Sequence, residues 1–182
     1  MNSHTLRRRK VGEILISLLL CGFLIALDQY SKALASAHLQ SGPFPLWEGV
    51  FELHYTINRG AAFGIFQNQI PYFLVVTTVL LIFIGYAYWR LPMDRKYRFI
   101  KGILVLLTAG AFGNLIDRAV NGYVIDFLYF KLINFPIFNV ADCYVCVSAF
   151  LFFIAFLFYY KEGDFACLSP RRWRKTDESQ RS

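Results

Sequence analysis

The chain has 182 residues, of which 57% are hydrophobic and 17% are charged, and its formal net charge is +7. It is too apolar for an ordinary soluble domain and too short for more than one membrane bundle. A basic tail that binds RNA would also explain the charge, but the basic residues fall beside apolar runs, so we expect no nucleic-acid partner. The sequence therefore predicts a small integral membrane protein.

Four apolar runs are long enough to span a membrane, because about 20 residues rising 1.5 Å each cross a hydrocarbon core of about 30 Å. These predicted spans cover about residues 13–35, 70–89, 99–117 and 140–160. The third run is the most polar, since it holds Lys101 and Asn114. We interpret it as a helix packed closely against its neighbours, because Gly102, Gly110 and Gly113 allow backbones to approach.

Lysine and arginine counts predict the orientation. With four spans, both termini lie on one side of the membrane, together with most of the basic residues. These are Arg7, Arg8, Arg9, Lys10, Arg90, Arg95, Lys96, Arg98, Lys101, Lys161, Arg171, Arg172, Arg174, Lys175 and Arg181. By the positive-inside rule both termini are cytoplasmic. We expect one membrane-embedded domain over residues 1–165 and a basic cytoplasmic tail over 166–182, attracted to anionic lipid.

Two segments then face the exterior, about 36–69 and 118–139. Residues 50–57 alternate in the manner of a half-buried strand, and residues 123–130 carry a similar signal. We expect these strands to form a small β-sheet at the outer membrane surface.

The cysteines and histidines give no strong motif. Cys143 and Cys146 have the spacing of a redox or metal pair, but they lie in an apolar run without a second pair or a nearby histidine. We therefore expect buried structural thiols. His4, His38 and His54 are scattered, so spacing assembles no metal cluster, and His54 is expected at the surface.

The N-terminus has a second interpretation. Arg7 to Lys10, an apolar stretch and Cys21 resemble a signal peptide whose cysteine receives a lipid. However, Leu20 stands where such a signal needs a small residue, and three further spans follow. This alternative is disfavoured.

Asp28 and Lys32 form the first polar cluster, four residues apart on one helix face in the order that favours pairing. Charged side chains at membrane depth are costly and usually functional. A plain ion pair at a helix end, with the lysine reaching toward the interface, is the alternative.

The second cluster follows the first predicted strand. Asn58 offers a hydrogen-bond donor and an acceptor to an extended peptide, while Gly60 and Gly64 permit tight backbone geometry. A loop with a polar anchor explains the same residues.

The third cluster closes the third span. Asn114 and Asp117 are three residues apart, so a helix presents them on nearly one face. We expect Arg118 to be the ionic partner of Asp117, which makes Asp117 a weaker candidate for proton transfer.

The last cluster joins Asp126, on a predicted strand, to Asp142, in the first turn of the final helix. Fifteen residues that include Pro136 separate them, so a hairpin-like excursion would bring the two together. Two acids in one low-dielectric site divide into a proton donor and a base, and such a pair activates water. The alternative is a helix cap and an unrelated strand residue.

Taken in order, these motifs resemble those of the lipoprotein signal peptidases. The motifs are Asp28 with Lys32, residues 58–63 (Asn-Arg-Gly-Ala-Ala-Phe), 113–118 (Gly-Asn-Leu-Ile-Asp-Arg), 124–127 (Val-Ile-Asp-Phe) and 138–142 (Phe-Asn-Val-Ala-Asp). The resemblance implies an α-helical integral membrane fold, with four transmembrane helices, a small extracytoplasmic β-cradle and both termini inside. It also implies an aspartic endopeptidase of the bacterial inner membrane.

The implied substrate is a prolipoprotein whose cysteine carries a diacylglyceryl group, and the cut falls on the amino side of that cysteine. The resemblance implies no metal and no other cofactor. Membrane lipids are expected partners, and the enzyme is expected to be a monomer.

The resemblance also assigns roles to residues. Asp126 and Asp142 would be the catalytic dyad, and the other positions would support the site or bind substrate. These supporting positions are Asp28, Lys32, Asn58, Asn114, Asp117, Arg118 and Asn139.

Two other classes of protein fit the intramembrane acids. Proton-coupled transporters use such acids as relays, but they usually contain internal repeats, and none is visible in this sequence. A structural assembly subunit could use the acids as polar contacts between helices, and it would have no peptidase activity.

Overall fold

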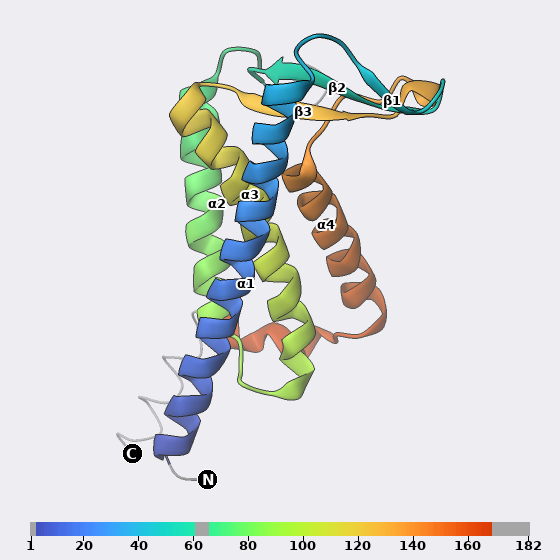
Figure 1. Ribbon diagram of the computed structural model, residues 1–182. Helices are drawn as coiled ribbons and strands as arrows, with labels where there is room; N and C mark the ends of the chain where they lie inside the picture. The colour runs from blue at the N-terminus through green and yellow to red at the C-terminus, as the bar shows by residue number, and fades with distance from the viewer. Residues whose placement is uncertain (1–2, 61–65, 169–182) are drawn as a thin grey trace, which may run out of the picture.

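The computed structural model describes residues 3–60 and 66–168 and contains four long helices (Figure 1). Their bounds are α1 Ser3–His38, α2 Ile70–Arg90, α3 Arg98–Asn121 and α4 Val140–Phe158. Each contains a stretch long and apolar enough to cross a membrane. Each predicted span coincides closely with one of these helices, and α1 extends beyond its predicted span at both ends.

Three antiparallel strands form one sheet in the order β1-β2-β3, with β1 Phe44–Trp47, β2 Phe51–Asn58 and β3 Val124–Tyr129. Figure 1 shows this sheet across one end of the bundle, which we call the sheet end. Both predicted strands are present. The sequence did not predict β1, a short edge strand that contains Pro45, and proline in a strand is tolerated mainly at such an edge.

The connection from β3 to α4 is the predicted hairpin-like excursion. It includes the short 3₁₀ helix η3, Lys131–Ile133. The backbone N–H groups of Phe127 and Leu128 both donate to the Phe138 carbonyl, at 2.9 and 2.8 Å. Phe138 N–H donates back to Leu128 O at 3.0 Å. The start of α4 is thereby held beside β3.

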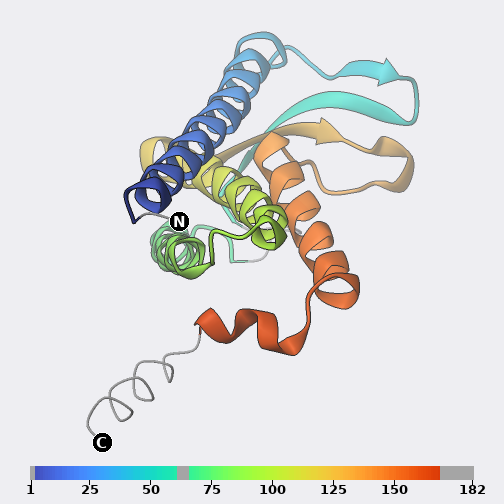
Figure 2. The same cartoon turned by 90° about the horizontal axis from the view of Figure 1, so that it is seen from below.

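Helix α3 lies between the other three helices (Figure 2). A Cβ atom on Gly110 would lie 2.5 Å from the Ala141 carbonyl oxygen, and one on Gly113 would lie 2.5 Å from Asp28 Oδ2. The predicted close approach is therefore confirmed at these two glycines. It is wrong for Gly102, where an added Cβ would meet no described atom within 4 Å.

The opposite end of the bundle holds η2, Arg95–Tyr97, and η4, Glu162–Leu168. Tyr160 is buried there, and Phe165 of η4 packs against the same apolar cluster. Arg90 donates two hydrogen bonds to the Cys167 carbonyl, at 3.0 and 2.6 Å. Cys167 and Leu168 of the predicted tail thus pack against the bundle, and residues 169–182 of that tail lie outside the described residues.

Candidate active site

A cavity of about 720 Å³ lies between the sheet, α3 and α4. Polar side chains from all three line it, and much of the remaining lining is apolar. The polar lining includes Asn58, Asn114, Arg118, Asp126 and Asp142, and the apolar lining includes Phe135, Phe138 and Val145. Concave, mostly apolar sites with a few converging polar groups are typical ligand sites.

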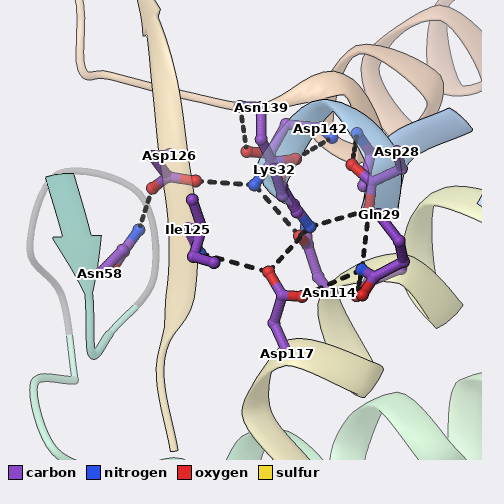
Figure 3. Close-up of polar contacts among 12 residues, drawn as sticks. Asp28, Gln29, Lys32, Asn58, Asn114, Asp117, Ile125, Asp126, Asn139 and Asp142 are labelled. Carbon is purple, nitrogen blue, oxygen red and sulfur yellow. Dashed lines mark hydrogen bonds and ion pairs between the residues drawn. The ribbon is translucent and has the colours of Figure 1, made fainter. Parts of the chain in front are cut away.

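Asp126 is held on β3 with only 2% of its surface exposed. One carboxylate oxygen accepts from Asn139 Nδ2 at 2.6 Å, and the other accepts from Asn58 Nδ2 at 2.9 Å (Figure 3). Burial, followed by the nearby charge of Asp142, raises the pKa of Asp126 from 3.8 to about 7. A carboxyl group with such a pKa can carry a proton at neutral pH.

Asp142 is fixed by a capping box at the start of α4. Its backbone N–H donates to Asn139 Oδ1 at 2.9 Å, and its Oδ2 accepts from the Asn139 backbone N–H at 3.1 Å. Asn114 Nδ2 of α3 donates to Asp142 Oδ1 at 2.7 Å. The position and the rotamer of Asp142 are therefore set by the cap of α4 and by the contact with α3.

Asn139 connects the two acids. Its side chain is fully buried, and its amide nitrogen donates to Asp126 Oδ1 at 2.6 Å and to Asn114 Oδ1 at 3.1 Å. The same residue caps α4 and binds Asp142. A single asparagine at this position thus fixes the strand acid relative to the helix acid.

Lys32 lies at the centre of the supporting network, with 1% of its surface exposed. Its Nζ is 2.9 Å from Asp28 Oδ2, Asp117 Oδ2 and Asn114 Oδ1. The ammonium group thus has three oxygen acceptors for its three protons. The predicted pair with Asp28 is present, whereas the alternative of a lysine reaching toward the interface is wrong.

The same ammonium orients Asn114. Because Asn114 Oδ1 accepts from Lys32 and from Asn139, its amide nitrogen is the group that faces Asp142. An amide offers donors on one side and an acceptor on the other, so the lysine contact determines which side meets the acid.

Asp28 and Asp117 each bind the backbone of an element that carries a cavity acid. Asp28 Oδ1 accepts from the Ala141 backbone N–H at 2.8 Å, in the first turn of α4. Asp117 Oδ2 accepts from the Ile125 backbone N–H at 3.2 Å, in β3. The two acids beside Lys32 therefore position α4 and β3.

The prediction that Arg118 pairs with Asp117 is wrong. Adjacent residues on an α-helix point about 100° apart, and Asp117 turns toward Lys32. Arg118 Nη2 donates to the Gly60 carbonyl at 3.2 Å, and its guanidinium lies 4.7 Å from the centre of the Phe73 ring. Arg118 lines the cavity and binds the backbone two residues beyond the end of β2.

Gln29 belongs to the network, although it lies in none of the sequence motifs. Its amide nitrogen donates to Asp117 Oδ1 at 2.9 Å, and to Asp28 Oδ2 and the Gly113 carbonyl at 3.2 Å. The feature of the sequence that could have identified Gln29 is its position: it is an uncharged polar residue next to Asp28, within an apolar span.

The amide of Asn58 is used inside the protein. Its nitrogen binds Asp126, and its oxygen accepts from the Gly60 backbone N–H at 2.9 Å. Each group thus has one partner inside the protein, and because Asn58 lines the cavity, its contact with a bound peptide stays a prediction. The rest of this motif, Ala61 to Phe63, lies outside the described residues.

The cysteine prediction is also wrong. Cys143 is partly buried and Cys146 is exposed, and both line the cavity. His54 is half-exposed, with Nδ1 3.6 Å from Glu52 Oε1. Across residues 3–60 and 66–168, no group of three histidine, cysteine, aspartate or glutamate side chains is arranged to hold a metal.

The chain is similar to known proteins along most of its length. A family model described as signal peptidase (SPase) II matches residues 20–158. The lipoprotein signal peptidase of Caldanaerobacter subterraneus subsp. tengcongensis is 39% identical over 150 residues, which cover 81% of this chain and 99% of the relative. That of Brevibacillus brevis is 41% identical over 131 residues, or 71% of this chain and 87% of the relative.

A solved bacterial membrane enzyme has the same fold, with a TM-score of 0.71 and 30% sequence identity. The match covers 82% of this chain and 93% of that enzyme. The four membrane helices, the sheet and the family match make this a multi-pass bacterial membrane enzyme. The chain belongs to the signal peptidase II family of aspartic peptidases.

Proposed function

We propose that this enzyme removes the signal peptide from diacylglyceryl-modified prolipoproteins by cutting on the amino side of the lipidated cysteine. The observation that carries the proposal is the pair Asp126 and Asp142. They come from different elements, line one cavity and are connected through Asn139. Two acids in such a site share the work of acid and base.

Asp126 is the better proton carrier, because its pKa is raised to about 7. Asp142 lies at the N-terminus of α4, where the helix dipole favours an ionised carboxylate. We therefore assign the resting proton to Asp126 and the negative charge to Asp142. The two groups titrate as a coupled pair.

In the proposed reaction, Asp142 removes a proton from water as the water oxygen bonds to the scissile carbonyl carbon. Asp126 donates a hydrogen bond to the carbonyl oxygen and stabilises the tetrahedral intermediate. Asp142 then passes its proton to the leaving nitrogen as the C–N bond breaks. The products are a peptide with a new carboxylate and a lipidated cysteine with a free amino group.

The remaining residues support this chemistry. Asn114 and Asn139 hold the acids by hydrogen bonds, and Lys32 fixes the orientation of Asn114. The apolar part of the cavity suits a substrate that brings acyl chains and an apolar signal segment. Such a substrate would enter laterally from the lipid.

We also propose that the sheet end faces the cell exterior and that both termini are cytoplasmic. The end opposite the sheet contains the α2–α3 connection and η4, and several basic residues lie there. They include Arg90, Arg95, Lys96, Arg98 and Lys161. This distribution agrees with the positive-inside rule.

The test is cleavage of a diacylglyceryl prolipoprotein by the purified enzyme in liposomes. Asp126→Asn and Asp142→Asn, made separately, should each abolish cleavage while the protein still folds and inserts. Asp94→Asn is the matched control, because Asp94 lies in the α2–α3 connection, away from the cavity. It should cleave at the wild-type rate.

Normal cleavage by either cavity variant would refute the dyad. A prolipoprotein without the lipid should be a poor substrate. Equal cleavage of the lipidated and unlipidated forms would instead indicate a general signal peptidase.

A further inference from the structure

The cavity contains two thiols that the proposed reaction does not use. Cys143 follows Asp142 directly, and Cys146 lies one turn further along α4. Both side chains line the same cavity as the two acids, with Cys146 exposed and Cys143 partly buried. Cysteines in inert structural roles are usually buried in apolar surroundings, so this placement is unusual.

These thiols do not suit a metal site or a disulfide. The part of the chain that the structure describes contains no group of three potential metal ligands arranged around them. Side chains at i and i+3 of a helix have Cβ atoms about 5–6 Å apart, whereas a disulfide requires about 3.5–4.5 Å. Bridging them would distort the helix that carries Asp142. Each cysteine therefore remains a free thiol, and the exposed Cys146 is the more accessible of the two.

We propose that Cys143 and Cys146 form a covalent modification site inside the substrate cavity, suited to apolar soft electrophiles such as α,β-unsaturated carbonyl compounds. The site rests on the proposed function, because blocking matters only if substrate occupies this cavity. The apolar lining, which includes Phe135, Phe138 and Val145, favours an electrophile that partitions into membranes.

The chemical step is a conjugate addition. The thiolate sulfur bonds to one alkene carbon of the electrophile and the C=C π bond breaks. A proton from solvent, equivalent to the one that the thiol lost, ends on the neighbouring carbon. No oxidant or metal takes part.

The positions of the two thiols on α4 determine what an adduct would block. Cys146 is four residues from Asp142, so it lies about 6 Å further along the helix axis on the same face. An adduct on either thiol occupies cavity space within about one helical turn of the acid. It therefore excludes the peptide that must reach Asp126 and Asp142.

The other two cysteines are internal controls. Cys21 on α1 and Cys167 in η4 are partly buried, and neither lines the cavity. Modification of these thiols leaves the cavity open. A Cys21→Ser/Cys167→Ser variant keeps only the cavity thiols, and a Cys143→Ser/Cys146→Ser variant keeps only the controls.

The experiment treats the full-length enzyme in liposomes with N-benzylmaleimide, maps adducts by peptide mass spectrometry and then measures cleavage. Each variant is compared with its own untreated rate. We expect adducts on Cys146 before Cys143. Cleavage should fall on the order of tenfold or more in wild type and in the Cys21→Ser/Cys167→Ser variant, because substrate is displaced from the acids. The fall should be less than about twofold in the Cys143→Ser/Cys146→Ser variant, whose remaining thiols lie outside the cavity.

A second readout does not depend on activity. In the Asp126→Asn background, lipidated prolipoprotein at about four times its dissociation constant should slow adduct formation at the cavity thiols about fivefold by occupancy. It should leave the rate at Cys21 unchanged.

Several results would overturn the inference. They are full alkylation of both cavity thiols with cleavage intact, no adduct on either of them, or equal inhibition of the variant that lacks them. Failure of the proposed function is recognised separately, as absence of cleavage by the untreated wild-type enzyme. Adduct mapping would then still decide whether the thiols are accessible.

Discussion

Two buried lysines join α1 to α3 at opposite ends of the bundle, and their surroundings differ. Lys32 at the sheet end is 1% exposed and lies 2.9 Å from two carboxylate oxygens and one amide oxygen. Lys101 at the opposite end is 7% exposed and lies 2.9 Å from the single carboxylate of Glu13, which is partly exposed. Its other neighbours are the Met93 sulfur and the Tyr88 ring.

The difference distinguishes an ion pair that positions other residues of the site from one that only joins two helices. The acceptors of Lys32 go on to bind the backbone of α4 and β3 and the carboxylate of Asp142. Among the contacts described here, Glu13 contacts Lys101 and Arg98 and reaches neither of these elements. Both lysines connect α1 to α3, but of the two only Lys32 is linked by its contacts to the proposed catalytic pair.

The largest expected effect comes from Lys32→Met, which removes the charge and keeps most of the side-chain volume. Asp28 and Asp117 would then face each other without a counter-charge, and breaking a buried pair in this way costs about 3–5 kcal/mol. Thermal unfolding in detergent should show this loss. Cleavage should fall about 100-fold, because Asn114 loses its orienting contact. Wild-type stability and activity would contradict the role given to this network.

Next in size is the pH dependence of cleavage. The pKa of Asp126 is raised from 3.8 to about 7, so the proton that the proposed mechanism assigns to it leaves as the pH rises above 7. Cleavage should then fall about tenfold per pH unit. Asp94→Asn should keep the wild-type profile, and a rate that stays flat up to pH 9 would refute the assignment of the proton.

The same titration affects stability. Because the folded-state pKa of Asp126 exceeds the unfolded value, its contribution to stability is fully present below about pH 4 and is lost as the pH rises through 7. Asp126→Asn should therefore reduce the change in unfolding temperature between about pH 4 and pH 7.

A smaller effect is expected from Gly113→Ala. Its new Cβ would lie 2.5 Å from Asp28 Oδ2 and 3.2 Å from the Ala141 side chain. Overpacking of this kind costs about 1–3 kcal/mol, and displacement of Asp28 should slow cleavage several-fold. Gly102→Ala is the matched change near Lys101, where an added Cβ meets open space, and it should be neutral or stabilising by about 0.5–1 kcal/mol. Equal effects of the two substitutions on cleavage would show that packing at the sheet end is no more important for activity than packing at the opposite end.

The smallest effect should follow from Lys101→Met. Glu13 is partly exposed and can be solvated when its partner is removed, so the loss of stability should be about 1 kcal/mol or less. Cleavage should change less than about twofold, since this pair does not contact the elements that carry Asp126 and Asp142. A loss of activity as large as that of Lys32→Met would show that the two ends are coupled.

Much of the fold was predictable from local patterns. The spans follow from the length of the apolar runs, and β2 and β3 follow from alternation along the chain. The edge strand β1 was missed because four residues that include Pro45 give no such alternation. Its formation depends on pairing with β2.

The errors within the candidate site have a shared origin. Sequence adjacency predicts Arg118 as the partner of Asp117, whereas the observed partner, Lys32, lies far away in the chain. The apolar span predicts that Cys143 and Cys146 are buried, yet the face of α4 that carries them is open to the cavity. Sequence gives the residue types on each element but not which neighbour each side chain meets.

By itself, the sequence determined a four-span membrane protein with a small sheet, a family resemblance and a set of polar residues in costly positions. These follow from hydrophobic length, strand alternation and motif order, which are properties of the chain alone. The tertiary structure decided that Asp126 and Asp142 share one cavity, that Lys32 satisfies two acids and that Asn139 connects the pair. Hydrogen bonds and ion pairs require contact within about 3 Å, and only the packing of α1, α3, β3 and α4 brings these groups so close.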